Sequence, residues 1–370
     1  MRYTQTLRKV LFTGSRSLAS SVVSELIKPG REQLPHPQEY PIFLMHGFMG
    51  FNQMKLLGIP LFDYFNGVKA LLEQMGYIVV VDSVKPIDTP MNRANEWANH
   101  LNKALAKHKA EKVHIIAHSQ GCIDARILAA PVGNRCPHHA CYGFDEELAG
   151  KGYGDRIASM TFLGGPHLGT PLANPGSENE MQKMLIGLLK ILAKIDGVSG
   201  ENVEKTINMM SRDYMISTFN PHILVPDTIP CYTVAGNPGC KHHVSMLLEE
   251  SWEALEKIPA AEGGGANDGF VPVTSAHYGG EEKKLHGTDV KQWQALGTVT
   301  TDHVGLIGLP LEKEKQHRFA HLPMYAGLAQ YLDPCYRNCT DMTLLPDGQW
   351  ERSCKPGCAT APAPVKKKAA

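Results

Sequence analysis

The sequence lacks the features that define several large classes of protein. It contains no stretch of about 18 or more apolar residues, which excludes an ordinary transmembrane helix. Neither sign of charge predominates, because 37 basic residues balance 37 acidic ones, so no overall field favours nucleic acid as a partner. What the chain does have is apolar residues, at 43% of 370, and enough length to bury them in one large core.

The first segment, residues 1–38, has no acidic residue among its first 24 positions and four basic ones there. Its apolar patch at residues 10–12 is far shorter than the apolar centre of about 7–15 residues in a secretory signal. We interpret the segment as a basic arm lying on the domain or as a leader of another type. At the other end, residues 359–370 are almost entirely Ala, Pro and Lys and are expected to be a disordered tail.

Between these ends, apolar runs of strand length alternate with helical patterns. Fully apolar strands separated by helices are typical of parallel sheets that are covered on both faces. We therefore predict an α/β fold with a mostly parallel central sheet flanked by helices. The predicted strands are residues 41–45, 77–81, 113–117, 157–163 and 231–235. The predicted helices are residues 68–75, 95–108 and 122–130.

A five-residue motif, A-H-S-Q-G at residues 117–121, joins one predicted strand to the following predicted helix. This is the context of a nucleophile elbow, in which a tight strand-to-helix turn lifts a serine above the sheet. Small residues are needed two positions before and after the serine, so that strand and helix can approach. Ala117 replaces the more usual first glycine but is still small. We predict that Ser119 is a catalytic nucleophile rather than part of a purely structural turn.

The first predicted strand is followed by H-G-F-M-G at residues 46–50. In hydrolases of this type such a turn leaves a backbone N–H facing the serine. The amides of Phe48 and Gln120 would then form an oxyanion hole for the tetrahedral intermediate. We interpret His46 as a structural hydrogen-bonding residue under this turn rather than as a catalyst.

A serine nucleophile needs a base, and the base needs an orienting acid. Two later motifs supply candidates, N-D-G-F-V at residues 267–271 and T-D-H-V-G at residues 301–305. The chain order Ser119, Asp268, His303 is the order found in α/β-hydrolases. Asp302 and Asp289 are alternative acids, but the turn motif around Asp268 favours that residue.

These motifs together resemble the bacterial true lipases of lipase family I, in the α/β-hydrolase superfamily. The resemblance covers residues 40–308 and includes the helix start at residues 92–96 and G-G-P-H-L-G-T-P at residues 164–171. It implies an α/β-hydrolase catalytic domain over residues 39–334, with a helical lid insertion at about 171–215. It also implies hydrolysis of carboxylic esters, typically long-chain acylglycerols, at a lipid interface.

Apolar residues recur at helical spacing within the predicted lid, which indicates an amphipathic helix. A core helix would give the same stripe, but the position after residues 164–171 favours a lid that contacts lipid. Through this lid we expect peripheral contact with a membrane or a lipid droplet. The predicted lid and acyl-binding residues are Met181, Met184, Leu185, Leu188, Leu189 and Leu192.

The resemblance also implies a structural calcium ion, bound partly by an aspartate two positions after the catalytic histidine. That position is Gly305 here, and the stretch before Asp268 offers only Glu249 and Glu250. Calcium needs several fixed oxygen ligands, so we expect this calcium site to be damaged. We expect the ester chemistry itself to require no cofactor.

The nine cysteines are the last clue. If Cys122 beside the elbow is free, the other eight form four neighbouring couples, which favours disulfides and a secreted or periplasmic location. Zinc is a less favoured alternative, suggested by the Cys and His residues at 136–141 and 240–243 and by the four cysteines between 335 and 358. Ordinary free thiols are the third alternative. Two of the disulfides would lie in the C-terminal extension, residues 335–358. The four couples are Cys136 with Cys141, Cys231 with Cys240, Cys335 with Cys339, and Cys354 with Cys358.

We therefore predict a lidded serine ester hydrolase of the triacylglycerol lipase type. The nearest alternatives use the same residues: a short-chain esterase, a phospholipase or a polyester depolymerase. An acyltransferase and a non-catalytic binding module are weaker alternatives. Sequence motifs specify neither the acyl length nor the oligomeric state.

Overall fold

The computed structural model describes residues 40–48, 53–56, 59–130, 152–174, 200–278, 293–309, 319–333, 337–338 and 340–355. Its strands are β1 (Ile42–Met45), β2 (Gln53–Leu56), β3 (Ile59–Asp63), β4 (Val79–Val81), β5 (Val113–His118), β6 (Ile157–Leu163), β7 (Cys231–Gly236), β8 (Trp293–Val299), β9 (Thr340–Leu344) and β10 (Trp350–Cys354). Its α-helices are α3 (Val68–Gln74), α4 (Pro90–His108), α5 (Gln120–Ala129), α8 (Gly200–Asn208), α9 (Arg212–Tyr214), α10 (Asn220–His222), α11 (Glu249–Lys257), α12 (Val273–Ala276) and α14 (His321–Leu332).

Six strands form one central sheet in the order β4-β1-β5-β6-β7-β8, and every neighbouring pair is parallel. In a parallel sheet all carboxyl ends lie along one edge, so the loops that follow β1, β5, β6, β7 and β8 are brought together there. The predicted mostly parallel sheet is confirmed. The strand β8 at its edge was not predicted.

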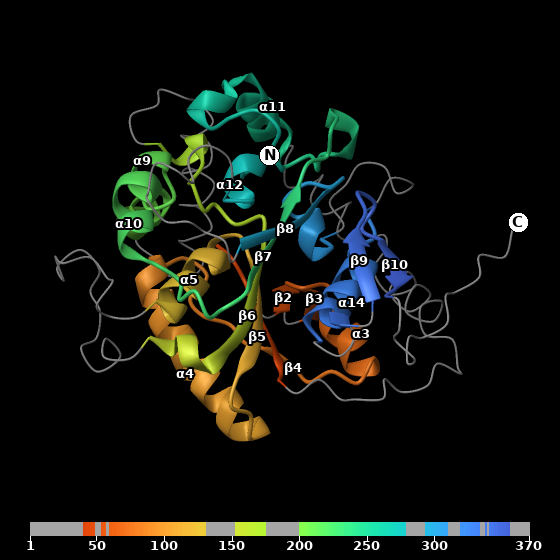
Figure 1. The fold of residues 1–370 in the computed structure, drawn as a ribbon. Coiled ribbons are helices and arrows are strands. Elements are labelled where there is room, and N and C mark those ends of the chain that lie inside the picture. Colours follow the sequence, from red (N-terminus) through yellow and green to blue (C-terminus); the bar gives the residue numbers. More distant parts are fainter. Residues whose placement is uncertain are drawn as a thin grey trace, which may run out of the picture.

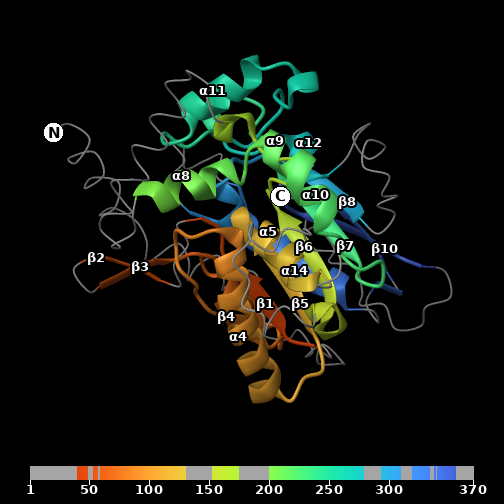
Figure 2. The same ribbon diagram turned by 90° about the vertical axis from the view of Figure 1, so that its left-hand side faces the viewer.

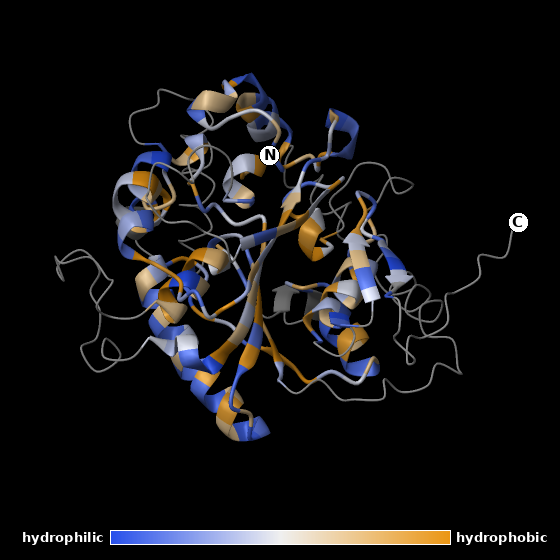
Figure 3. Cartoon of the chain, in the orientation of Figure 1, coloured by the Kyte–Doolittle hydropathy of each residue, from blue (hydrophilic) through white to orange (hydrophobic). Residues whose placement is uncertain are grey.

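Two layers of helices cover the sheet, with α4 and α5 on one face and α3 and α14 on the other (Figure 1). The alternation of side chains along β1 explains both layers. Ile42 and Leu44 belong to the core that contains residues of α3 and α14, whereas Phe43 and Met45 belong to the core beneath α4 and α5. Colouring by hydropathy shows the central strands mainly hydrophobic, with hydrophilic turns on α4 and α11 (Figure 3).

Helix α4 begins at Pro90, five residues before the predicted start at Asn95. The Thr89 hydroxyl accepts a hydrogen bond from the backbone N–H of Asn92 at 3.4 Å, which caps the helix. Proline is well suited to the first helical position, because its missing N–H would have no partner there. The earlier start places Arg93 on the buried face of the helix.

Two antiparallel hairpins lie outside the central sheet. The hairpin of β2 and β3 extends away from the body (Figure 2). The hairpin of β9 and β10 packs against α14, where the indole N–H of Trp350 donates to the Met324 carbonyl at 3.1 Å. A Cβ atom added at Gly327 would lie 2.0 Å from the Trp350 ring, so this glycine makes room for the indole. Leu344 of β9 also contacts Gly297 of the edge strand β8.

One predicted disulfide is wrong. Cys231 and Cys240 are both free thiols, as is Cys122. Cys231 is the first residue of β7, and Cys240 follows the other end of that strand. A six-residue strand spans roughly 20 Å, whereas a disulfide requires Cα atoms less than about 7 Å apart. The other predicted couples involve residues whose side chains lie outside the described part of the chain.

Across the described ranges, no helix is both long enough and apolar enough to cross a membrane. The N-terminal segment 1–38, the tail 359–370 and the predicted lid residues 181–192 also lie outside these ranges.

Burial lowers the pKa of four histidines in this core. The pKa falls to about 3 for His46 and about 4 for His114, and well below the usual 6.5 for His118 and His167. Above pH 6.5 both the folded and the unfolded chain hold these rings neutral. Below it, only the unfolded chain gains the proton, so stability falls as the pH falls.

We expect the free energy of unfolding to fall between pH 6 and pH 5 by up to about 1.4 kcal/mol for each of these four histidines. Urea unfolding followed by tryptophan fluorescence measures this slope. The variant His114→Asn keeps a polar partner for the Ser159 hydroxyl, now 2.7 Å from the ring, but removes one titrating group, so its slope is shallower. The matched change at exposed His242 serves as the control. Equal slopes for the two variants would contradict the prediction.

Candidate active site

Ser119 lies on the turn between β5 and α5, with φ 57° and ψ −131°. A positive φ is rare for a residue with a side chain and costs about 1–3 kcal/mol, so the surrounding contacts must hold it. The Ser119 N–H donates to the Leu163 carbonyl of the neighbouring strand at 3.0 Å, and the Ser119 carbonyl accepts from the Cys122 N–H at 3.0 Å. The serine is therefore fixed at the carboxyl edge of the sheet, as an elbow requires.

Close backbone approaches explain the glycines around this turn. A Cβ atom added at Gly121 would lie 2.7 Å from the carbonyl oxygens of both Met45 and His46. A Cβ atom added at Gly47 would lie 2.5 Å from the Cβ atom of Ser119. The loop after β1 therefore contacts the serine directly, and only glycine fits at either position.

Asp268 and His303 are brought together from different loops. The ring atom Nδ1 of His303 lies 2.8 Å from Oδ2 of Asp268. The other carboxylate oxygen accepts the N–H groups of Phe270 at 3.0 Å and Val271 at 2.7 Å. The backbone N–H of His303 donates to the Asp268 carbonyl at 2.7 Å. Asp268 is fully buried, so this carboxylate can orient the ring and fix its tautomer with little competition from water.

The pair lies over the loop that follows β6. A Cβ atom added at Gly164, where φ is 54°, would lie 2.9 Å from Oδ2 of Asp268 and 3.2 Å from Nδ1 of His303. The alternative acid Asp302 instead bonds to Ser245 and Gly305. The other alternative, Asp289, lies outside the described residues.

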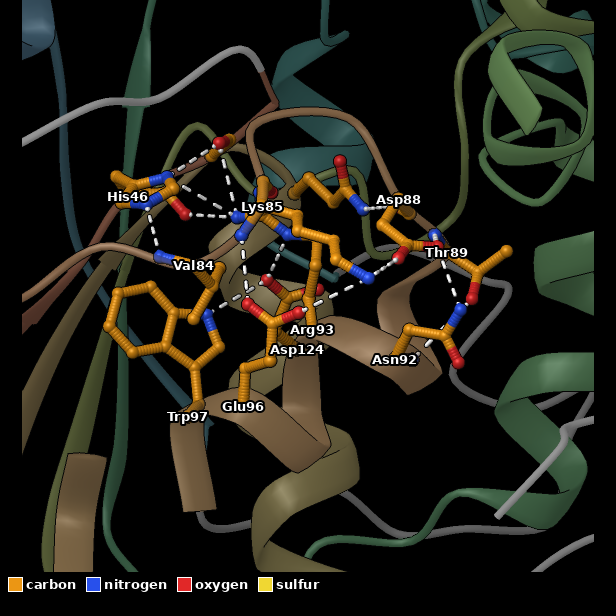
Figure 4. A network of polar contacts seen from close by, with 12 residues as sticks. His46, Val84, Lys85, Asp88, Thr89, Asn92, Arg93, Glu96, Trp97 and Asp124 are labelled. Atoms are coloured by element: carbon orange, nitrogen blue, oxygen red, sulfur yellow. Dashed lines mark hydrogen bonds and ion pairs between the residues drawn. The ribbon is translucent and has the colours of Figure 1, made fainter. Parts of the chain in front are cut away.

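The loop after β1 is held from below by Arg93, a fully buried residue of α4 (Figure 4). Its Nε atom forms an ion pair with Asp124 of α5 at 2.8 Å, and Trp97 donates to the same carboxylate oxygen at 3.2 Å. Burial raises the pKa of Asp124 to about 6, while the Arg93 charge opposes that rise. At neutral pH the pair is therefore ionised.

The rest of the Arg93 guanidinium fixes the peptide planes of that loop. Its Nη2 atom donates to the carbonyl of His46 at 2.6 Å and to that of Gly47 at 3.1 Å. In a trans peptide the C=O and the following N–H point in opposite directions. Because Arg93 holds the Gly47 carbonyl, the N–H of Phe48 points away from Arg93, as an oxyanion donor would require.

His46 and Gln120 complete this arrangement. His46 is buried, and its ring bonds to the Val84 N–H at 3.1 Å and to the Gly47 carbonyl at 2.9 Å. Gln120 is the first residue of α5, so its N–H has no partner within the helix and is available to a ligand. Its side chain is held separately, by a bond to the Asp88 carbonyl at 2.9 Å.

A chain of hydrogen bonds connects the Gly47 turn to the His303 turn. The Gly47 N–H donates to the Tyr64 hydroxyl at 3.0 Å, and that hydroxyl lies 2.7 Å from Nδ1 of His118. The Nε2 atom of His118 lies 3.0 Å from the His303 carbonyl. Since burial keeps His118 neutral, it has one ring proton, so it donates to His303 and accepts from Tyr64.

Phe48 is part of an apolar region that includes residues of helix α8. Its side chain packs against the buried cluster that contains Ile87, Ala173, Val203 and Ile207. Helix α8 lies inside the range 171–215 predicted to hold the lid. The described part of that range therefore contributes residues to the cluster against which the candidate oxyanion residue packs.

Among the described residues, no group of three or more His, Cys, Asp or Glu side chains is arranged to hold a metal ion. His243, one member of the predicted zinc alternative, bonds through its ring to the Pro238 carbonyl at 3.1 Å.

The sequence and the fold are similar to those of known proteins. No family model matches the chain. It is 30% identical to a triacylglycerol lipase of Pseudomonas fragi over 36% of its own length and only 37% of that protein. It is also 30% identical to a triacylglycerol lipase of Vibrio cholerae, over 65% of this chain and 74% of that protein. The chain belongs to the family of bacterial triacylglycerol lipases.

Members of this lipase family are carboxylic ester hydrolases, and the resemblance inferred from the motifs is confirmed. The structure of lipase 1 from Pelosinus fermentans superposes with a TM-score of 0.57 at 17% identity, over 80% of this chain and 99% of that one. This likeness, together with the six parallel strands, confirms the α/β-hydrolase fold.

Sequence reasoning missed three residues of this lipase site: Arg93, Tyr64 and His118. The sequence did contain a signal for Arg93, which lies four positions before Trp97 on the apolar stripe of its helix. A charged residue on such a stripe indicates a buried partner of opposite charge. Tyr64 and His118 gave no such signal. They are 54 positions apart, and nothing in their local sequence indicates that they meet.

Proposed function

We propose that this protein hydrolyses carboxylic esters of lipids, with Ser119 as nucleophile, His303 as base and Asp268 as the acid that orients it. The observation that carries the proposal is the buried 2.8 Å contact between Nδ1 of His303 and Asp268. The ring of His118, the residue before Ser119 on the strained elbow, bonds to the His303 carbonyl. With Nδ1 donating to Asp268, the Nε2 atom of His303 is free to accept a proton.

In the proposed reaction the Ser119 hydroxyl oxygen bonds to the ester carbonyl carbon while its proton passes to His303. The N–H groups of Phe48 and Gln120 stabilise the negative oxygen of the tetrahedral intermediate. When that intermediate collapses, the bond to the alcohol breaks and His303 returns the proton to the departing oxygen. Water then attacks the acyl-serine by the same steps and releases the fatty acid.

The surroundings of the site support an apolar substrate. Phe48 packs against the apolar cluster that includes Val203 and Ile207 of α8. The turn that follows Val244 exposes Met246 and Leu247 by 55% and 56%. Both named relatives are triacylglycerol lipases, and we extend that substrate class to this chain. The proposal includes a lid over residues 171–215, whose apolar side chains contact the lipid surface.

Two measurements on the intact chain test this function. A fluorophosphonate, which reacts with activated serines, is expected to add its mass to Ser119 of the wild type and to leave Ser119→Ala unmodified. With p-nitrophenyl esters from acetate to palmitate, kcat/KM should rise by up to about fourfold per methylene until the acyl cleft is filled.

Modification at another serine would overturn the assignment of Ser119. A maximum at acetate would contradict the lipid substrate and favour a short-chain esterase. Alcohol-dependent formation of new esters in place of free acid would favour an acyltransferase.

A further inference from the structure

Asp302 is a fully buried carboxylate that precedes the proposed base and takes no part in the pair with Asp268. Its Oδ2 atom accepts the backbone N–H of Ser245 at 2.6 Å and also the Ser245 hydroxyl. Its Oδ1 atom accepts the N–H of Gly305 at 2.8 Å. Three donors therefore offset the cost of burying this charge.

The partner residue, Ser245, belongs to a turn that contacts the chain next to each member of the acid–base pair. The Leu248 N–H donates to the Ser245 carbonyl at 2.8 Å, which closes the turn. Leu248 lies against Gly269, where an added Cβ atom would be 2.9 Å from the leucine Cβ. The turn thus contacts the residue after Asp268 through packing and the residue before His303 through hydrogen bonds.

The donors around Asp302 do not fit a calcium ion. Calcium is bound by several oxygen atoms whose lone pairs face it. Here both carboxylate oxygens face N–H and O–H groups, whose hydrogens occupy the directions that a cation would need. Gly305, at the position where the family resemblance implies a ligand aspartate, supplies one of these N–H groups.

We propose that Asp302 and Ser245 form a metal-independent link that positions His303, in place of the structural calcium that the family resemblance implies. Asp302 is a positioning residue, since it contacts the turn that carries the base rather than the reacting atoms. This role rests on the proposed function of His303.

The test uses the full chain with two variants, Asp302→Asn and Ser245→Ala. The control Ser159→Ala removes an equally buried hydroxyl that bonds to the His114 ring. We measure kcat and KM for a p-nitrophenyl ester well below the unfolding temperature, and thermal unfolding, each with calcium or with EDTA. Wild-type values are expected to be the same in both solutions.

Both site variants should lower kcat by about tenfold to a hundredfold with KM nearly unchanged, because a base displaced by a fraction of an ångström reacts more slowly. Calcium should not restore their kcat. Ser159→Ala should keep the wild-type kcat. If Asp302→Asn does not fold, the test rests on Ser245→Ala. That variant should fold, because it retains the backbone N–H that bonds to Asp302.

Three results would overturn the link: loss of wild-type activity in EDTA that calcium restores, a wild-type unfolding temperature raised by calcium, or site variants that unfold earlier but keep the wild-type kcat. Wild-type protein without ester hydrolysis would be a failure of the proposed function instead. In that case the unfolding temperatures still test the link. A decrease in unfolding temperature that is larger in Ser245→Ala than in Ser159→Ala, and that calcium does not reverse, supports the link. Equal decreases in the two variants overturn it.

Discussion

Replacing Ser119 by alanine is expected to lower kcat for ester hydrolysis by roughly 10⁴-fold to 10⁶-fold, because no other group can form the acyl-enzyme. The protein should remain folded, since the backbone bonds of the elbow to Leu163 and Cys122 do not use the hydroxyl. Initial rates with a p-nitrophenyl ester, measured beside a thermal unfolding curve, check both statements.

A double variant makes this test sharper. If Ser119 and His303 act as one unit, then Ser119→Ala, His303→Ala and the double variant should all have about the same residual rate, from binding and the oxyanion hole. Losses that multiply would mean that the two residues act independently, and that outcome contradicts the proposed mechanism.

The second large effect is expected at Arg93. Changing it to methionine leaves the Asp124 carboxylate buried without a positive charge to pair with. This should lower the free energy of unfolding by about 3–5 kcal/mol. It also removes the donors to the His46 and Gly47 carbonyls, so the Phe48 N–H is no longer fixed. We expect kcat to fall by about 10²-fold to 10³-fold, as for other lost oxyanion donors.

The two effects of Arg93 can be separated by a second change. In Arg93→Met with Asp124→Asn the buried charge is gone, and the amide oxygen can still accept from Trp97. Much of the stability should return in urea unfolding, while kcat should stay low. Recovery of kcat together with stability would show that Arg93 acts on the fold alone and does not orient Phe48.

The sequence predicted those parts of this molecule that depend on neighbouring residues. Apolar runs identified five of the six strands of the sheet, and motifs located the turns after β1, β5 and β8. The edge strand β8 was missed because its exposed face makes it polar and it contains Gly297. Its place in the sheet depends on pairing with β7 and on cover from β9, which no local pattern reveals.

Contacts between distant residues account for the other errors. Cys231 and Cys240 are close in sequence but separated by a strand, so counting cysteines suggested a disulfide that does not form. Asp302 was considered only as a substitute for Asp268, because its partner Ser245 lies 57 positions earlier. Tyr64 and His118 are 54 positions apart, and His118 and His303 are 185 positions apart, so their link became visible only in the folded chain.

The hairpin of β9 and β10 has a consequence for how the protein is made. Residues 340–355 supply Leu344 and Trp350 to the same core as α3 and α14, and Leu344 covers part of β8. During synthesis on a ribosome, all the proposed catalytic residues emerge before this hairpin does. The apolar surface around Gly297 and Gly327 then stays uncovered until the hairpin follows, so a nascent chain that stalls there would expose apolar surface prone to aggregation.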